Sequence, residues 1–343
     1  MLGRTFLILI VAVVALAPMY APKVLELSWK TFIATPADPK LGTLSRKTVE
    51  EMVREGSFAG KHMLVVGGTK GIGRGIARMA AAVGCGSVTI VGRSGGDMVV
   101  REMERIGKKR KYAFISADLS TTAGVTGLIQ TLAGKALVYD ALVMSVGVWP
   151  DSSDPFTSEG YNKVAFIDVV ARFGVFCGLL EKRLLAKDAQ VVSVLASGNK
   201  MKGYPDMSFA REFFKANSTF QGGVESVLMT AGVSIDTVIV EASAKNPSLT
   251  FVGTMPGLIV TDLCIPTLGQ TLADIAGVLM TALGIDMTED ECGLNHLSIM
   301  SSSAVRLHKL SLWDHYLVGR TVPEGITLAY RKWLWETLEK ILK

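Results

Sequence analysis

A glycine-rich stretch, VVGGTKGIGRG at residues 65–75, is the part of the sequence best suited to chemistry. It ends a short apolar run that is typical of a buried strand, and it opens a run with helical spacing. Glycines allow a tight turn and close approach of a pyrophosphate, and the helix that follows offers unpaired N–H groups to the phosphates. The stretch predicts a dinucleotide site, whose expected members are Gly67, Gly68, Thr69, Lys70, Gly71, Ile72 and Gly73.

The residues after the second expected strand distinguish between the two nicotinamide cofactors. An NAD site places an acid there for the ribose hydroxyls, but this chain has Arg93 and Ser94 and no carboxylate before Asp97. Lys70 adds a second cation in the glycine loop. A guanidinium and an ammonium suit a 2′-phosphate, and each charged hydrogen bond contributes about 1.5–3 kcal/mol. NADP is the expected cofactor; the alternative is that both cations are simply solvated.

The rest of the chain alternates strand-like and helical segments. Further short apolar runs of strand type lie at residues 87–93, 111–119, 139–146, 189–197 and 249–257. Helical stretches separate them, notably 158–186 and about 220–244. This alternation predicts an α/β fold, a Rossmann-type doubly wound parallel sheet of about seven strands. No break in composition divides residues 61–343, which we expect to form a single NAD(P)-binding domain.

From residue 61 onward the chain resembles the short-chain dehydrogenase/reductase family, whose fingerprint spacing G-x-x-x-G-x-G is present in GGTKGIG. The resemblance extends through ADL at 117–119, VMSVG at 143–147 and PGLIVTDL at 256–263. It implies that Asp118 hydrogen-bonds the adenine, with Leu119 beside it, and that Thr261 contacts the nicotinamide carboxamide. The VMSVG segment matches the family's N-N-A-G only at Gly147, which the resemblance assigns to the cofactor site.

The catalytic half of the chain resembles the family less closely. The family uses a tyrosine as acid, a lysine four residues later that lowers the tyrosine pKa, a serine that holds the substrate oxygen, and an asparagine that orders a water relay. Ser197 lies where the serine belongs, and Asp168 aligns with the asparagine. An acid at that position could still bind water, but it changes the local charge.

The tyrosine–lysine pair is missing from the positions where the resemblance implies it. Counting back through the helix after residue 220 places the pair at about Gly222 and Glu225, and a slip of six residues places it at Leu228 and Gly232. Tyr204 is the candidate substitute acid, although an ordinary loop role is the alternative. General acid–base catalysis typically contributes about 10²–10⁴-fold. Efficient use of the family's standard mechanism is therefore not expected.

The first 22 residues contain an apolar run from Phe6 to about Ala21. It is slightly shorter than the roughly 20 residues that span a bilayer, a difference that a tilted or snorkelling anchor can accommodate. A signal anchor, a cleaved signal peptide and a soluble helix are all open, with Pro18 disfavouring cleavage. We expect a membrane-associated protein of the endoplasmic reticulum or another endomembrane, or a secreted protein after cleavage. Residues 23–60 are expected to be a linker with a short helix near 47–54.

The overall composition argues against two classes of partner. The net charge is +5, and acidic and basic residues are mixed along the chain, so no basic face for nucleic acid is expected. The four cysteines lie far apart, and the histidines show no ligand spacing, so no metal site is predicted.

The sequence predicts a membrane-associated, NADP(H)-dependent oxidoreductase that acts on an apolar carbonyl or alcohol. In this hypothesis the glycine loop, Lys70 and Arg93 hold the cofactor, Ser197 orients the substrate oxygen, and the proton donor is unassigned. The alternative is a catalytically degenerate protein that retains NADP(H) as a ligand for sensing or scaffolding. The apolar segment 271–284 is expected to pack in the core as a helix; the alternative is that it lines a substrate pocket or dips into a membrane. A homodimer is compatible with both hypotheses.

Overall fold

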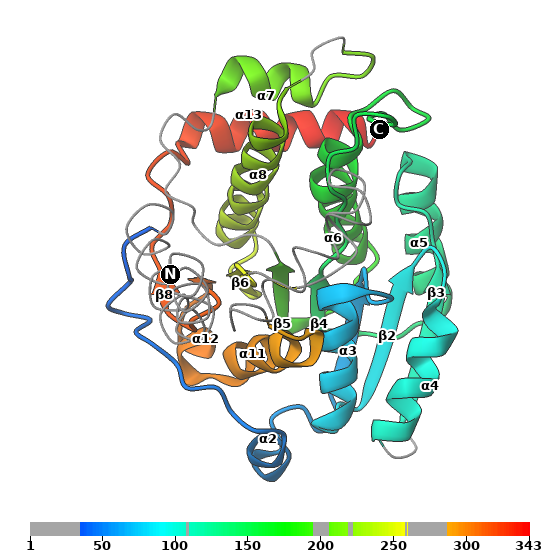
Figure 1. Cartoon of the computed structure of the whole chain (residues 1–343), viewed down its shortest axis with the longest axis vertical. Helices are drawn as coiled ribbons and strands as arrows, with labels where there is room; N and C mark the ends of the chain where they lie inside the picture. Colours follow the sequence, from blue (N-terminus) through cyan, green and yellow to red (C-terminus); the bar gives the residue numbers. More distant parts are fainter. Residues whose placement is uncertain (1–34, 108–109, 195–205, 219–221, 258, 260–286) are drawn as a thin grey trace, which may run out of the picture.

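A single twisted sheet crosses the molecule, with helices on both of its faces (Figure 1). The computed structural model describes residues 35–343 except 108–109, 195–205, 219–221, 258 and 260–286. Within these residues, eight strands form the sheet in the order β3-β2-β1-β4-β5-β6-β7-β8. The strands are β1 (His62–Val66), β2 (Ser87–Gly92), β3 (Lys111–Ser116), β4 (Tyr139–Met144), β5 (Leu185–Val194), β6 (Thr250–Thr254), β7 (Leu310–Trp313) and β8 (Gly319–Arg320).

Neighbouring strands are parallel except at one edge of the sheet. Every pair from β3 to β7 is parallel, and only the pair formed by β7 and β8 is antiparallel. The order reverses between β1 and β4, as in doubly wound sheets. The Rossmann-type parallel sheet predicted from the sequence is therefore confirmed.

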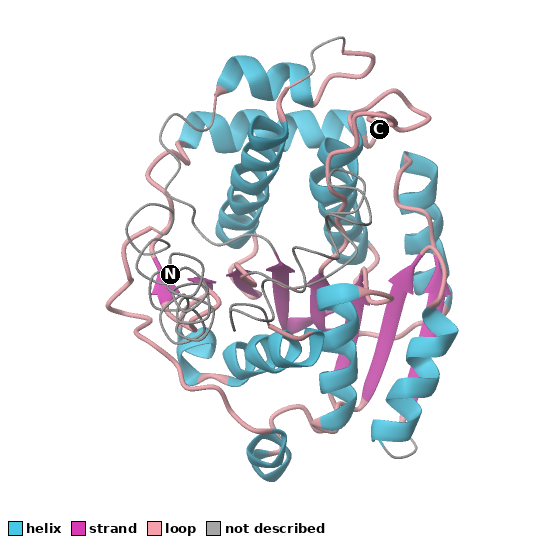
Figure 2. Cartoon of the chain, viewed as in Figure 1, coloured by secondary structure: helices cyan, strands magenta, loops and turns pink. Residues whose placement is uncertain are grey.

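Helices cover both faces of the sheet, as Figure 2 shows. Their bounds are α2 (Val49–Glu55), α3 (Gly71–Ala82), α4 (Gly96–Gly107), α5 (Thr122–Gly134), the π-helical η2 (Ala165–Val170), α6 (Ala171–Glu181), α7 (Met207–Phe213), α8 (Val224–Lys245), α11 (Glu289–Ser301), α12 (Ser303–Leu307) and α13 (Leu328–Ile341). Because side chains alternate along a strand, Leu64 and Val66 pack with α5, α6, α8 and α13. Met63 and Val65 pack with α2, α3, α4 and α11 on the other face.

Two elements differ from the sequence prediction. The helix expected over 158–186 begins only at η2, because residues 157–161 form a turn in which the Thr157 N–H donates to the Tyr161 carbonyl and Gly160 has φ +81°. The seventh parallel strand, β7, has four residues. A run this short carries too little periodicity to be recognised in a sequence.

Helices α3 and α11 pack backbone to backbone, and Figure 1 shows them side by side. A Cβ atom added to Gly75 would lie 1.9 Å from the Glu289 carbonyl oxygen. A Cβ atom added to Gly293 would lie 2.4 Å from the Gly75 carbonyl oxygen. Only glycine at both positions allows this approach, which places the first turn of α11 beside the helix that follows the glycine loop.

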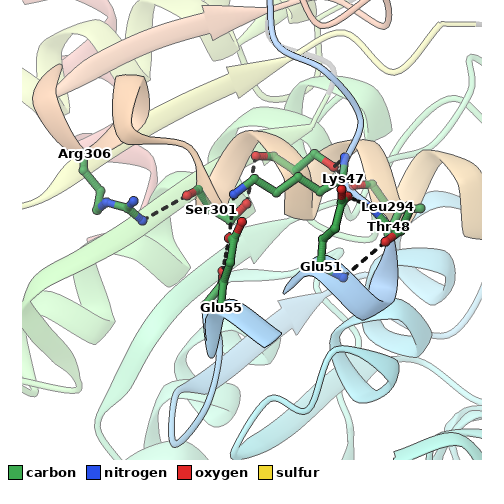
Figure 3. A network of polar contacts seen from close by, with 9 residues as sticks. Lys47, Thr48, Glu51, Glu55, Leu294, Ser301 and Arg306 are labelled. Carbon is green, nitrogen blue, oxygen red and sulfur yellow. Dashed lines mark hydrogen bonds and ion pairs between the residues drawn. The ribbon is translucent and has the colours of Figure 1, made fainter. Parts of the chain in front are cut away.

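Residues 43–55, which the sequence analysis assigns to a linker, pack on α11. The backbone N–H of Lys47 donates to Ser298 Oγ at 2.9 Å, and Arg46 Nε donates to Asn295 Oδ1 at 2.6 Å. Figure 3 shows the polar network around this contact, including the 2.6 Å ion pair between Lys47 and Glu55. Thr48 and Glu51 form a capping box at the start of α2, which stabilises that short helix.

Residues 35–43 are held at the antiparallel edge of the sheet. Arg320 of β8 forms an ion pair with Asp314, and both side chains are buried. The same guanidinium donates to the Thr35 carbonyl at 3.1 Å, and Thr35 Oγ1 donates to the Thr321 carbonyl at 2.9 Å. Isolated bridges at Ala37 and Thr43 continue the contact.

The N-terminal apolar segment, residues 1–22, lies outside the described residues, so its role as an anchor or signal stays a prediction. Among the residues that the structure describes, one helical stretch, Ser226–Lys245 of α8, is long and apolar enough to cross a membrane. Of the apolar window in this stretch, 61% is buried inside the protein, and a core helix of a globular domain shows the same combination of length, hydropathy and burial. The apolar segment 271–284 also falls outside the described part of the chain.

The glycine contact between α3 and α11 predicts a position-specific effect on stability. Gly75→Ala should lower the free energy of unfolding by about 1–3 kcal/mol, because the added methyl group must displace the backbone of α11. Gly127→Ala, in the exposed part of α5 with no atom near its Cβ position, is the matched control. It should raise the free energy of unfolding by about 0.5–1 kcal/mol. Urea denaturation of both variants measures the difference, and equal effects would contradict the close contact.

A buried histidine predicts loss of stability in acid. His296 Nδ1 donates to the Cys292 carbonyl at 2.7 Å, and Nε2 lies 2.9 Å from Thr254 Oγ1. Burial lowers the pKa of His296 from 6.5 to about 4. Between these values the unfolded chain binds a proton that the folded chain does not, so stability falls as the pH is lowered.

From pH 7 to pH 5 this histidine should therefore remove about 2 kcal/mol of the free energy of unfolding. His296→Gln retains a polar amide but removes the titration. Urea denaturation at the two pH values should give a smaller loss for the variant than for the unaltered chain. Parallel losses in the two proteins would show that His296 does not contribute.

Candidate functional site

A cleft of about 1060 Å³ lies along the carboxyl ends of the parallel strands. Its lining residues include 67 and 69–72 after β1, 92, 93 and 95 at the end of β2, 117–120 after β3, and 145–152 after β4. Open α/β sheets bind their ligands at this edge, at the point where the strand order reverses. The cleft thus lies where the sequence predicts a dinucleotide.

The turn between β1 and α3 can be made only with glycine. Gly67 has φ +90°, and a Cβ atom added there would lie 2.4 Å from the backbone nitrogen of Val146. A Cβ atom at Gly73 would lie 2.2 Å from the Gly67 carbonyl oxygen. The N–H groups of Gly67 and Gly68 donate to the Val91 carbonyl at 2.9 and 3.1 Å, which closes the turn. The backbone of the loop is therefore tightly packed against β4 and the start of α3.

The first turn of α3 offers a binding place for an anion. The helix begins at Gly71, and its N-cap residue, Lys70, has an extended backbone and no side-chain capping hydrogen bond. Lys70, Gly71 and Ile72 line the cleft together with Thr69. Uncapped N–H groups and the helix dipole favour phosphate at such a position.

The positive charges of the cleft differ in their surroundings. Arg74 is engaged by two carboxylates: it donates to Glu102 at 2.7 and 3.1 Å and to Glu289 at 3.1 Å. Arg93 lines the cleft and is exposed, and no carboxylate among the described residues pairs with it. Its backbone carbonyl accepts a hydrogen bond from Ser116 Oγ at 2.9 Å, which fixes the chain after β2. Arg93 is therefore able to bind a phosphate; Ser94 is exposed and is not among the lining residues.

The residues after β3 lie at the same end of the cleft as Arg93. Asp118 is exposed, and its Oδ1 accepts the Ser120 N–H at 3.0 Å. Leu119 is buried, and both residues line the cleft. This arrangement suits a planar ring system against Leu119, with a carboxylate at its rim.

Asp168 and Arg172 lie beneath the floor of the cleft and are not among the residues that line it. Asp168 is 4% exposed, and its Oδ1 accepts the Val148 N–H at 2.9 Å. Burial raises the pKa of the Asp168 carboxyl, while the Arg172 cation and the Val148 hydrogen bond oppose this shift. Asp168, expected to bind water at the reacting centre, is instead placed as a support for the loop around Gly147, which does line the cleft.

The end of the cleft beyond β4 is largely apolar. Trp149, Phe156, Ile167, Val194 and Val227 line it. Polar side chains also line this end, among them Asp151, Asn162 and Lys163, and the indole Nε1 of Trp149 is buried without an acceptor in the described part of the chain. An apolar molecule with few polar groups is the kind of ligand that suits this lining.

The structure describes only some of the residues that the sequence predicts at the reacting centre. Ser197, Tyr204 and Thr261 lie outside the described residues, so their roles stay predictions. Gly222 lines the cleft, so one of the positions counted for the missing tyrosine is at the site. The described lining residues include no tyrosine or histidine, and Lys163 is ion-paired with Asp154.

Sequence reasoning missed Arg172, Trp149 and Glu289. Arg172 had a signal, because a cation four residues after an acid in an otherwise apolar helical run indicates a buried pair. Trp149 directly precedes Pro150 in a loop, where aromatic residues are often exposed, and nothing in the sequence marks it as part of a cleft. Glu289 reaches the cleft only because α11 packs on α3.

Part of the chain is similar to known oxidoreductases. Residues 61–209 match the family model described as short chain dehydrogenase. A 3beta-hydroxysteroid dehydrogenase from Mediterraneibacter gnavus is 32% identical over 152 residues, which cover 44% of this chain and 54% of that protein. Oxidoreductase andH from Emericella variicolor is 27% identical over 264 residues, covering 76% of this chain and 74% of that protein.

A solved structure has the same fold. The short chain dehydrogenase from Burkholderia cenocepacia, in complex with NADP, gives a TM-score of 0.53 at 19% identity, covering 79% of this chain and 99% of that one. The sheet order and the glycine turn define a Rossmann-type dinucleotide-binding fold. Within that class, the chain is similar to the short-chain dehydrogenase/reductase family, whose model matches residues 61–209.

Proposed function

We propose that the chain is an NADP(H)-dependent oxidoreductase that acts on an apolar carbonyl or alcohol. The observation that carries this proposal is a single cleft in which the glycine turn, the uncapped start of α3 and Arg93 lie in sequence. A diphosphate fits the helix start, and a 2′-phosphate fits the guanidinium beyond β2. The bound NADP of the Burkholderia cenocepacia relative supports the choice of cofactor.

The chemistry follows from the cofactor, which supplies a hydride to a carbonyl carbon or accepts one from an alcohol carbon. The chain must hold the cofactor and the substrate together, exclude water, and supply or remove one proton at the substrate oxygen. In this proposal Ser197 orients that oxygen, Thr261 contacts the carboxamide, and Tyr204 is the candidate acid. In this proposal the apolar side chains around Trp149 and Val227 help to exclude water from the reacting end.

An apolar substrate is proposed on two grounds. The cleft beyond β4 is lined mainly by aromatic and aliphatic side chains, which favours a ligand that buries apolar surface. A relative with 32% identity is named for a hydroxysteroid, a rigid apolar alcohol. A keto-steroid or a fused-ring ketone is therefore the first class of compound to test.

Removing Arg93 should change cofactor preference. In the full chain, solubilised in mild detergent, Arg93→Ala should weaken NADPH binding about 10- to 100-fold, because a hydrogen bond to a charged group contributes about 1.5–3 kcal/mol. Binding of NADH should change by less than about twofold, since it has no 2′-phosphate to meet the guanidinium. Titration of NADPH and NADH fluorescence measures both affinities. Arg101→Ala, on the exposed side of α4, is the matched control, and equal losses for the two cofactors would refute the 2′-phosphate assignment.

Turnover should depend on Ser197. The full chain, mixed with NADPH and a panel of keto-steroids, fused-ring ketones and medium-chain aldehydes, should oxidise NADPH with at least one compound. Ser197→Ala should lower the rate about 10²–10³-fold, because the developing charge on the substrate oxygen loses its hydrogen bond. Ser248→Ala, exposed at the amino end of β6 on the opposite edge of the sheet, should leave it unchanged. NADPH binding without oxidation across the panel would contradict the enzymatic proposal and favour a nucleotide-binding protein.

A further inference from the structure

The buried charges beneath the cleft have no role in the function proposed above. Arg172 is 3% exposed and Asp168 is 4% exposed. They lie one helical turn apart where η2 passes into α6. Burying an arginine is costly unless its N–H groups are satisfied, so the groups that Arg172 binds show what it holds in place.

Arg172 joins the ends of two neighbouring strands. Its Nε donates to the Val146 carbonyl, two residues after β4, at 2.7 Å. Its Nη1 donates to the carbonyl of Val194, the last residue of β5, at 2.6 Å. A guanidinium is planar and holds its donors at fixed angles, so these bonds set the separation of the two strand ends.

Asp168 holds the backbone on the other side of Gly147. Val146 is held by Arg172, and Val148 is held by Asp168 through its N–H group. Gly147, between them, lies directly against the pair: a Cβ atom added there would be 3.1 Å from Asp168 Oδ2 and 3.3 Å from Arg172 Nη2. The backbone on both sides of Gly147 is therefore fixed by buried charged groups.

The position of this support in the cleft follows from the strand order. Arg93 and Asp118 follow β2 and β3, and the glycine turn follows β1. A dinucleotide with its diphosphate at the turn and its adenosine over β2 and β3 must direct its nicotinamide toward β4 and β5. Gly147 and Val194 both line the cleft in that direction.

We propose that Arg172 and Asp168 are positioning residues that hold Gly147 and the ends of β4 and β5 beneath the nicotinamide end of the bound cofactor. This inference rests on the proposed function, since it assumes that the cleft binds NADP(H). The two residues act through the backbone and touch neither cofactor nor substrate. Their removal should affect the nicotinamide half of the site and leave the adenosine half unchanged.

The test compares a whole cofactor with its adenosine half in the full chain. The ligands are NADPH and adenosine 2′,5′-bisphosphate, which contains the adenosine and the 2′-phosphate without the nicotinamide. Arg172→Met should weaken NADPH binding about tenfold or more, because the charged hydrogen bonds to the Val146 and Val194 carbonyls are lost. The affinity for the bisphosphate should stay the same, and the emission of bound NADPH should shift toward that of the free cofactor.

Two further variants control for a general loss of stability. Arg320→Met removes another buried arginine, one that is ion-paired with Asp314 and lies in β8, at the opposite edge of the sheet from β3. It should lower the melting temperature without changing the ratio of the two affinities. Arg172→Lys keeps the positive charge but loses the planar guanidinium that binds both carbonyls. Its NADPH affinity should therefore lie between those of the unaltered chain and Arg172→Met. The lysine variant also serves as the test if the methionine variant does not fold.

The outcomes separate the two proposals. If the unaltered chain binds both ligands and the Arg172 variants weaken both equally or neither, the positioning role is wrong and the proposed function stands. If the unaltered chain binds neither ligand, the proposed function is wrong, and the inference falls with it. A selective loss of NADPH affinity in the Arg172 variants, absent from Arg320→Met, supports the inference.

Discussion

The close backbone approach between the glycine turn and the end of β4 is the constraint on which the rest of the arrangement depends. Gly67 leaves no room for a side chain against Val146, and Gly73 leaves none against Gly67. These contacts bring the start of α3 to the edge of the sheet, where its uncapped amides meet the cleft. The second glycine contact, between Gly75 and Gly293, then brings α11 and its Glu289 to the same place. Cofactor site, helix packing and charge balance thus share one backbone geometry.

Charge in the cleft is graded from one end to the other. At the β2 and β3 end, Arg93 is exposed and meets no carboxylate within the described part of the protein. Near the turn, Arg74 is neutralised by Glu102 and Glu289. Beneath the β4 and β5 end, Arg172 is buried against Asp168 and donates to backbone carbonyls. Of these three guanidinium groups, only that of Arg93 is suited to attract an anion. This distribution of charge is consistent with a ligand whose own charge is concentrated at one end.

Much of the fold could be predicted from the sequence, because glycine spacing and short apolar runs report local structure. The strands from β1 to β6, the turn at Gly67 and the exposed position of Arg93 follow from such patterns. The role of Asp168 could not be predicted, since a family alignment places it at the reacting centre, and only the three-dimensional packing shows it supporting Val148. The packing of residues 43–55 on α11 could not be predicted from local sequence patterns either, because their contacts with Asn295 and Ser298 join segments about 250 positions apart.

The attachment of Thr35 to Arg320 and Thr321 has a mechanical consequence. The polypeptide enters the domain at the β8 edge, which is the far side of the sheet from β3 and the proposed adenine position. Tension applied at Thr35 would act first on Arg320 and Thr321, which bind it, and these lie at the sheet edge away from the glycine turn. A domain tethered by its leading segment would therefore keep its ligand-binding rim unstrained.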